Sequence, residues 1–360
     1  LKRVLIWGHA DFGKPRVRIA EAGLRAAGVS VERIVASVWE GIEDKSALSG
    51  PGAKLRLAGR ILLSYPRLVW RFLRSERPDA VLVCYPGHLD VMVLWPFARL
   101  RRVPVVWDVF ISAYDTIVED RGLVSRESLA ARVIRWGERR AMKCATRVLM
   151  DTPSHARNQV DEYDLAPERV GWFPVGVETD RFPPVAPRVY TPHDPVRVLF
   201  YGQFIPLHGI ETIIRAAALP SAAGMRFTLI GRGQTEARVR ALIDHLSLTN
   251  VTWLPWVDYS ELVGHIHDAD VCLGIFGDTA KAGRVIPNKV YQILSSGMPL
   301  VTRDSTDLET LLGAQPEAVR TVPAASPEAL VHSITNLTQS LRGSRMPFNL
   351  QTAEAFAVSS

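Results

Sequence analysis

The strongest constraint on the fold is an alternation of short apolar runs with helical patterns, which occurs twice along the 360 residues. Near-continuous apolar runs are typical of strands buried on both faces of a parallel sheet. In the first half such runs lie at 3–8, 31–36, 80–85, 103–110 and 147–152. In the second half they lie at 196–202, 226–231, 251–257, 271–276 and 299–304. The pattern predicts an α/β chain with two Rossmann-like, doubly wound parallel-sheet domains that face each other across a cleft.

The two predicted domains are separated by a proline-rich segment. Residues 181–197, RFPPVAPRVYTPHDPVR, contain five prolines and little periodicity. We therefore expect one domain at 1–182, a linker at 183–197 and a second domain at 198–342. The tail 343–360 is a candidate to cross back to the first domain. Because ligands of open α/β sheets bind beyond the carboxyl ends of the strands, we expect the site there.

Composition is that of a globular protein with an excess of positive charge. The net charge is +6, the sequence pI is about 9.4, and no apolar run reaches the length of a membrane span. The start, LKRVLIWGHADFG, predicts a first strand, because its apolar run is short and no cleavage site follows. Cys84, Cys144 and Cys272 are far apart and odd in number, which indicates structural thiols in a reducing compartment. We expect a cytoplasmic protein.

Basic residues concentrate between 54 and 77, in KLRLAGRILLSYPRLVWRFLRSER. Six arginines and a lysine alternate there with large apolar residues, and Pro66 interrupts the stretch. One interpretation is an outer helix whose apolar face packs on a sheet. The other is peripheral contact with an anionic membrane, on its inner face. No nucleic-acid-binding motif accompanies the charge, so we expect no nucleic acid partner.

Two common phosphate-binding motifs are missing. Residues 8–13, GHADFG, have two glycines at the wrong spacing for a dinucleotide fingerprint, and 231–233, GRG, is a fragment of one. The chain has no P-loop either. These absences argue against an NAD-dependent oxidoreductase and against ATP-driven phosphoryl transfer through that loop.

A lysine stands at an unusual position in 284–297, RVIPNKVYQILSSG. Pro287 marks the first turn of a predicted buried helix, and Lys289 lies in that turn. The amino end of a helix is already positive, so a cation there is unfavourable unless an anion lies beside it. The segment therefore predicts an anion site at Lys289.

The ordered segments 175–182, 198–217, 229–239, 251–276 and 284–302 resemble the retaining glycosyltransferases of family 4, which have the GT-B fold. The resemblance implies a UDP- or GDP-linked sugar donor on the second domain and a hydroxyl acceptor on the first. The acceptor would be a glycan, a glycolipid or a small molecule. The resemblance also implies that no metal and no other cofactor is needed.

The resemblance also assigns donor-site residues. Those implied for the donor diphosphate are Lys289, Arg284, Gly13, Gln203, His208 and Gly209. Those implied for the nucleoside are Gln292, Arg232, Trp256 and Val257. The chain departs from the family here, because Arg284 and Gln292 replace two glutamates, and Gln203 and His208 replace an arginine and a lysine.

Polar residues that follow predicted strands of the first domain are the candidates for catalysis and acceptor binding. Candidates for catalysis are Asp115, His9 and Asp108, and candidates for acceptor binding are Asp11 and His88. The identity of a general base is left open. The function expected is retaining glycosyl transfer; the alternatives are a non-catalytic sugar-nucleotide-binding protein and a GT-B type epimerase or phosphorylase.

Overall fold

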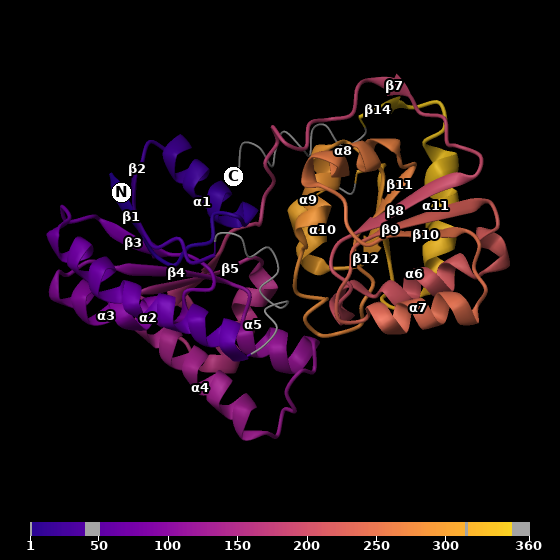
Figure 1. Ribbon diagram of the computed structural model, residues 1–360. Helices are drawn as coiled ribbons and strands as arrows, with labels where there is room; N and C mark the ends of the chain where they lie inside the picture. Colours follow the sequence, from indigo (N-terminus) through magenta and orange to yellow (C-terminus); the bar gives the residue numbers. More distant parts are fainter. Residues whose placement is uncertain (1, 40–50, 314–315, 348–360) are drawn as a thin grey trace. The chain divides into compact units, whose positions relative to one another are not determined.

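The computed structural model describes residues 2–39, 51–313 and 316–347, which fold into two compact units (Figure 1). Unit 1 comprises Leu1–Val118 and Gly122–Pro174, and unit 2 comprises Glu119–Arg121 and Val175–Ser360. The division between them falls eight residues before the boundary expected from the sequence. The reason is that the start of the proline-rich segment bonds to unit 2: Ser295 Oγ donates to the Phe182 carbonyl (2.8 Å) and the Val185 N–H donates to the Ser296 carbonyl (3.0 Å).

Unit 1 contains a six-stranded parallel sheet in the order β2-β1-β3-β4-β5-β6. Its strands are β1 (Arg3–Gly8), β2 (Ser30–Val35), β3 (Ala80–Val83), β4 (Val105–Phe110), β5 (Arg147–Met150) and β6 (Val170–Trp172). The first five confirm the predicted strands. The short β6 was not predicted, because its three residues carry no continuous apolar run.

Helices cover both faces of this sheet. They are α1 (Pro15–Ala26), α2 (Pro51–Arg74), α3 (His88–Leu100), α4 (Leu129–Cys144) and α5 (Pro153–Tyr163). Apolar residues of α2, α3, α4 and α5 share one core with Trp7, Trp107 and their strand neighbours. Val17 of α1 packs with Val4 and Ile6 in a separate cluster. The sheet of unit 1 is therefore doubly wound, as predicted.

Helix α2 runs through Pro66 without a break, so the interruption expected from the sequence is wrong. Tyr65, Leu68 and Phe72 of α2 are buried in the core, whereas Pro66 is exposed. Packing of the buried residues on both sides of the proline holds the helix together, although Pro66 has no N–H to donate to the preceding turn.

Unit 2 repeats the design, with a parallel sheet in the order β10-β9-β8-β11-β12-β13. Its strands are β8 (Val196–Tyr201), β9 (Met225–Ile230), β10 (Val251–Leu254), β11 (Val271–Leu273), β12 (Leu300–Arg303) and β13 (Val319–Val322). Its helices are α6 (Ile210–Ala217), α7 (Glu236–His245), α8 (Tyr259–Asp268), α9 (Asn288–Ser295), α10 (Thr306–Leu312) and α11 (Pro327–Ser340). Strand β13 was not predicted, because its central Arg320 and Thr321 interrupt the apolar run.

The described part of the tail belongs to unit 2. Strand β14 (Arg345–Met346) pairs antiparallel with β7 (Arg188–Val189). The remainder of the tail for which a return to the first domain was expected, residues 348–360, lies outside the described residues. Cys84, Cys144 and Cys272 are buried free thiols. In the described part of the chain, no helix is long and apolar enough to cross a bilayer.

Candidate functional site

His9 follows β1 and is held from both ring nitrogens. Its Nδ1 lies 2.6 Å from Asp90 Oδ1, and its Nε2 lies 2.7 Å from Ser64 Oγ. The backbone N–H of His9 also donates to Asp90 Oδ2 (2.8 Å). Tyr65 also donates to Asp90 (2.8 Å), and burial together with this carboxylate raises the pKa of Tyr65. Preceding His9, Gly8 has φ +103°, and a Cβ there would lie 2.5 Å from Asp90 Oδ2. The site thus holds the imidazole in one orientation.

Asp11 and Gly13 form the turn that starts α1. Asp11 Oδ1 accepts the Gly13 N–H (3.0 Å), and the Asp11 carbonyl accepts the Lys14 N–H (3.0 Å). Asp11 is buried and Gly13 is exposed. The carboxylate therefore shapes the backbone beyond β1, where the sequence placed an acceptor contact and a phosphate contact.

Asp108, expected from the sequence to be catalytic, forms a buried ion pair with Arg16. Arg16 donates to both Asp108 oxygens at 2.8–3.0 Å, and both side chains are almost fully buried. The same guanidinium reaches the carbonyls of Met150 and Phe173 and lies over the ring of Phe173. Asp108 is the counter-ion of an arginine that joins α1 to β4 and β5, and its catalytic role stays a prediction.

Glu138 of α4 organises the loop after β4, and the sequence did not single it out. Its carboxylate accepts the N–H groups of Ala113 (2.7 Å) and Tyr114 (3.0 Å) and the hydroxyl groups of Ser112 (2.8 Å) and Tyr163 (2.6 Å). Burial opposes this charge, but His88, Tyr163 and the Tyr114 N–H outweigh it and lower the pKa of Glu138. A buried carboxylate with this many donors is a rigid anchor.

His88 begins α3 and bonds to the same carboxylate. Its Nε2 lies 3.2 Å from Glu138 Oε1, and its ring meets the Trp107 ring edge-on at 4.8 Å. Its side chain is 24 % exposed, so part of the ring remains open to solvent. The preceding Gly87 has φ +49° and packs against Trp107.

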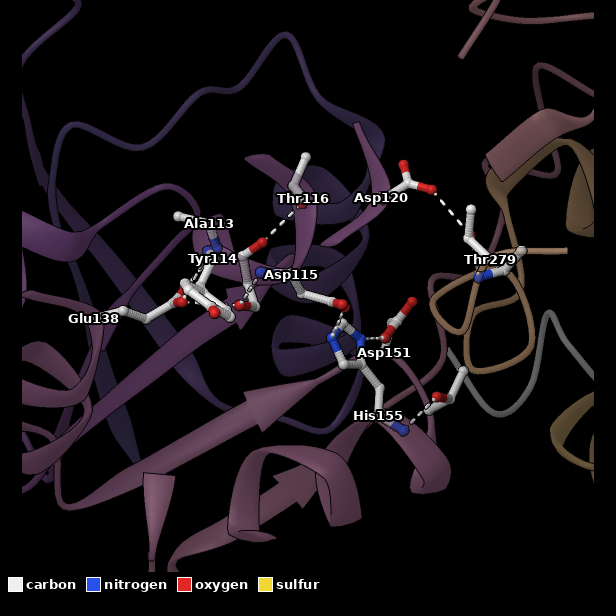
Figure 2. Close-up of polar contacts among 12 residues, drawn as sticks. Ala113, Tyr114, Asp115, Thr116, Asp120, Glu138, Asp151, His155 and Thr279 are labelled. Atoms are coloured by element: carbon white, nitrogen blue, oxygen red, sulfur yellow. Dashed lines mark hydrogen bonds and ion pairs between the residues drawn. The ribbon is translucent and has the colours of Figure 1, made fainter. Parts of the chain in front are cut away.

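Asp115 lies at the start of the π-helix Asp115–Asp120, and His155 of α5 links it to a second carboxylate. His155 Nε2 is 3.5 Å from Asp115 Oδ2, and its Nδ1 is 2.7 Å from Asp151 Oδ1 (Figure 2). Asp115 is 3 % exposed and His155 is fully buried. Burial disfavours the imidazolium, but Asp151 and Asp115 outweigh burial and raise the pKa of His155. His155 therefore orients Asp115, a role that the sequence did not reveal.

Lys289 lies in the first turn of α9, as predicted, and its ammonium group is buried. The residue is 4 % exposed, and no hydrogen-bond partner for Nζ occurs among the described residues. Nζ lies 3.7 Å from the centre of the Phe200 ring. Burial lowers the pKa of Lys289 well below its ordinary value. A buried amine with only a ring beneath it is energetically unfavourable, so Lys289 stays a candidate for binding an anion.

His208 lies next to Lys289, at the end of the loop after β8. A Cβ on Gly202 would lie 3.0 Å from Lys289 Nζ and 3.2 Å from His208 Cε1, so the glycine brings both groups to the strand end. His208 Nδ1 bonds to the Gln203 carbonyl. Burial, and then the charge of Lys289, lowers the pKa of His208 well below its ordinary value. His208 is thus a neutral donor or acceptor at neutral pH.

Gln203 and Gly209 complete this loop. The Gln203 side chain is exposed. Gly209 has φ +62° at the N-cap of α6, and a Cβ there would lie 2.5 Å from the Gly277 nitrogen. Only glycine fits, because the loop runs against the backbone that follows β11. The structure therefore brings His208, Gly209 and Lys289 together, as the sequence suggested.

Gln292 points from α9 toward two tyrosines. Its Oε1 accepts from Tyr201 (3.2 Å) and its Nε2 donates to Tyr259 (3.1 Å). The Tyr259 ring is 38 % exposed, whereas Tyr201 is buried. These tyrosines are additional candidates for the nucleoside side of the site. Arg284 precedes the helix, is half-buried and donates its backbone N–H to the Lys281 carbonyl (2.9 Å).

The other predicted nucleoside contacts lie beyond β9 and β10. Arg232 is exposed, and its carbonyl accepts the Phe204 N–H (3.0 Å). Trp256 is 57 % exposed, and Val257 is half-buried after the end of β10. Across the described residues, no group of three or more His, Cys, Asp or Glu side chains has the arrangement of a metal site.

Two parallel six-stranded sheets, each in a separate Rossmann-like unit, define the GT-B class of fold. Residues 14–176 match the family model for a glycosyl transferase 4-like domain, and residues 195–340 match that for glycosyl transferases group 1. The chain belongs to the GT-B glycosyltransferases of family 4 type.

Curated relatives include D-inositol 3-phosphate glycosyltransferases. That of Geodermatophilus obscurus is 37 % identical over 239 residues, which are 59 % of this chain and 51 % of the relative. That of Arthrobacter sp. (strain FB24) is 27 % identical over 292 residues, which are 73 % of this chain and 68 % of the relative. For two others the chain spans only 54 % and 52 % of the relative's length.

Solved structures show the same fold at low identity. Sucrose-phosphate synthase from Thermosynechococcus elongatus aligns with a TM-score of 0.68 and 15 % identity, covering 100 % of this chain and 95 % of that one. HepE of Anabaena, in complex with UDP, aligns with a TM-score of 0.61 and 12 % identity, again covering 100 % and 95 %.

Proposed function

We propose that the protein is a retaining glycosyltransferase that moves a sugar from a UDP- or GDP-linked donor to a hydroxyl acceptor without a metal ion. The observation that carries the proposal is the buried Nζ of Lys289, which has no partner among the described residues and lies in the first turn of α9. A diphosphate would supply the missing negative charge, and free N–H groups at the same helix end would bind its oxygens.

The chemistry needs positioning and charge stabilisation more than it needs a protein nucleophile. The bond from the anomeric carbon to the β-phosphate oxygen breaks, and the bond from that carbon to the acceptor oxygen forms. The acceptor proton passes to the leaving diphosphate, and Lys289 with the α9 N–H groups stabilises the charge on it. We place His9 and Asp115 on the acceptor side, oriented by Asp90 and His155 respectively.

Gln203 and His208 stand where the resemblance gives an arginine and a lysine, so this loop supplies less positive charge. The neutral His208 contributes hydrogen bonding, and Lys289 contributes the cation. Gln292, held by Tyr201 and Tyr259, contributes an amide to the ribose hydroxyls. Gln203, Arg284, Gly13, Arg232, Trp256, Val257, Asp11 and His88 remain assigned to donor or acceptor contacts by the sequence resemblance.

The acceptor is a hydroxyl compound, as the names of the inositol 3-phosphate relatives suggest, and the donor base is uracil or guanine. HepE in complex with UDP and with UDP-glucose supports the first of these bases. We further propose that the protein works in the cytoplasm, because its three thiols are free, and that residues 54–77 contact the inner face of the membrane.

A non-catalytic sugar-nucleotide-binding protein is the second candidate. It is favoured by Arg284 and Gln292, which stand where the family has glutamates. Such a protein would bind the same donor and give no turnover.

Calorimetric titration with UDP, GDP and ADP, each with and without magnesium, tests the proposal. We expect micromolar binding of UDP or GDP that magnesium does not change. Binding of none of the three would mean that the replacements have abolished the donor site. If a nucleotide binds, slow hydrolysis of the matching sugar nucleotide then distinguishes an enzyme from a binding protein.

A further inference from the structure

The outward sides of α2, α3 and α4 form one surface, which we call the three-helix face. The three helices lie on the same face of the unit 1 sheet, with α3 packed against both of the others (Figure 1). Ten of the fifteen large apolar side chains that are exposed in the described part of the chain lie on these helices. They are Leu55, Leu62, Leu63, Trp70, Leu73, Leu89, Leu100, Leu129, Val133 and Trp136.

The charge on this face has a single sign. Helix α2 contains no acidic residue, and the only acids of α3 and α4 are Asp90 and Glu138, which are 3 % and 1 % exposed. Exposed cations lie on the same three helices as the apolar side chains. They are Arg56, Arg60, Arg67, Arg74, Arg99, Arg132, Arg140 and Lys143.

Helix α4 shows the arrangement most clearly. Leu129, Val133 and Trp136 follow an i, i+4, i+7 spacing, so they share one side of the helix, and they are 75 %, 57 % and 68 % exposed. On the flank nearer α5, Arg135 pairs with Glu162 (2.7 Å) and Arg139 with Asp164 (3.4 Å). Within the described ranges, Arg132, Arg140 and Lys143 have no ion pair, and their charges stay available to a partner.

Three kinds of partner can be compared on this basis. A second copy of the chain, docked through the same face, would bring like charges together without an acid to neutralise them. A nucleic acid would neutralise the arginines but would leave ten leucine, valine and tryptophan side chains without apolar contact. An anionic bilayer both neutralises the positive charge and provides apolar contact. Its headgroups pair with the cations while the apolar side chains enter the interface.

We propose that α2, α3 and α4 together form a docking face for an anionic lipid bilayer, with α4 as its second principal element. This docking proposal rests on the proposed function. It extends the proposed membrane contact from the segment 54–77 to the whole three-helix face. A bilayer bound there makes a lipid-linked hydroxyl compound the acceptor class, since such an acceptor is presented at the surface that holds unit 1.

Co-sedimentation with phosphatidylcholine vesicles, with and without phosphatidylglycerol, tests the proposal. We expect the parent protein to bind only the vesicles with phosphatidylglycerol, and more weakly as salt increases. Arg132→Glu with Arg140→Glu on α4 should weaken that binding about tenfold or more, because each basic residue near an anionic surface contributes about fivefold. Trp136→Ser should weaken it about tenfold.

Arg215→Glu with Arg226→Glu is the matched control, because it makes the same change in net charge at exposed positions of unit 2. It should bind vesicles like the parent. The proposal would be overturned if the parent protein does not bind anionic vesicles. It would also be overturned if the α4 variants bind them as tightly as the parent does. A parent dimer that Trp136→Ser dissociates in sedimentation equilibrium would assign the face to a second copy instead. Nucleotide titration of each variant reports separately on the donor site, so its failure is distinguishable from failure to bind lipid.

Discussion

The buried position of Lys289 disfavours the folded state but favours the binding of a diphosphate. The amine is buried against Phe200 with no counter-ion in the described chain, which disfavours the folded state. The same position makes the amine strongly attractive to a diphosphate, because little water screens it. A residue that destabilises the empty protein at the point where an anion is expected is typical of a binding site.

Lys289→Met should therefore stabilise the folded protein and weaken its binding of the nucleotide. We expect the free energy of unfolding to rise by about 1–3 kcal/mol and diphosphate binding to weaken by about 1.5–3 kcal/mol. Urea denaturation and calorimetry measure the two effects. Lys2→Met, at an exposed lysine, is the control and should change neither. Equal nucleotide affinity of Lys289→Met and parent would falsify the phosphate role.

The pH dependence of that variant has a defined sign. The pKa of Lys289 is lower in the folded than in the unfolded state, so the unfolded chain binds more protons between the two values. Burial of Lys289 therefore destabilises the folded protein most at low pH. This destabilisation decreases as the pH rises toward 10.5, the ordinary pKa of a lysine. The stability difference between Lys289→Met and parent should shrink over that interval.

His155 gives the opposite pH dependence. Its folded pKa is raised above 6.5 by Asp151 and Asp115 against the effect of burial. Its stabilising contribution is complete below the unfolded pKa and is lost as the pH rises through the folded pKa. His155→Asn should remove this component, so the stability difference from the parent should be largest at acid pH and fall as the pH rises. Denaturant titrations across pH measure it. His245→Asn, at an exposed histidine, should leave the curve unchanged.

At the scale of elements, long-range pairs position the candidate catalytic groups. Glu138 of α4 bonds the loop after β4 and His88 of α3, and Arg16 of α1 bonds Asp108 of β4. The first of these contacts links α4 both to a loop and to α3, and the second links α1 to a strand; in each case the partners are more than 20 residues apart in the sequence. The strand ends of unit 1 therefore act as a framework for His9 and Asp115 that unfolding of any one helix would disturb.

Helix α2 contains a local weakness that substitution can relieve. Pro66 is exposed in mid-helix and leaves one backbone hydrogen bond unmade. Pro66→Ala should raise the free energy of unfolding by about 1–3 kcal/mol. Pro153→Ala is the control, because Pro153 stands in the first turn of α5, where no such bond is lost. A stability gain from Pro153→Ala equal to that from Pro66→Ala would contradict the explanation, and urea denaturation compares them.

At the scale of the whole molecule, the proposed function divides the donor and acceptor groups between two units with separate sheets. The donor candidates Lys289, His208 and Gln292 belong to unit 2, and the catalytic candidates His9 and Asp115 belong to unit 1. Each unit positions its own groups through its own core.

Nucleotide alone should therefore protect only part of the chain from hydrogen exchange. We expect UDP or GDP at saturation to slow amide exchange about tenfold or more in 201–209 and 288–295. Exchange in α5 (Pro153–Tyr163) should stay the same. The comparison is made by mass spectrometry of the intact chain with and without nucleotide. Protection confined to unit 1 would place the donor elsewhere.

Much of the candidate site could be predicted because its signals are local. Lys289 was singled out because a cation at the amino end of a helix is electrostatically unfavourable. The short segment 284–297 is enough to show this. Gly209 and His208 were predicted from the resemblance of 198–217 to the family. Glu138 was missed because a lone acid in a basic helix looks solvent-exposed until its partners from other elements are known. His155 was missed because its contact with Asp115 joins two elements that are distant in the sequence.

The sequence by itself determined the two Rossmann-like units, since apolar runs at strand spacing are a property of neighbouring residues. It also predicted an anion site at the start of α9. Only the tertiary structure decided that Asp108 pairs with Arg16, that His155 lies between two carboxylates, and that α4 shares an exposed basic face with α2. The physical reason is that these features join residues distant along the chain, and which side of a helix remains exposed depends on what the other side packs against.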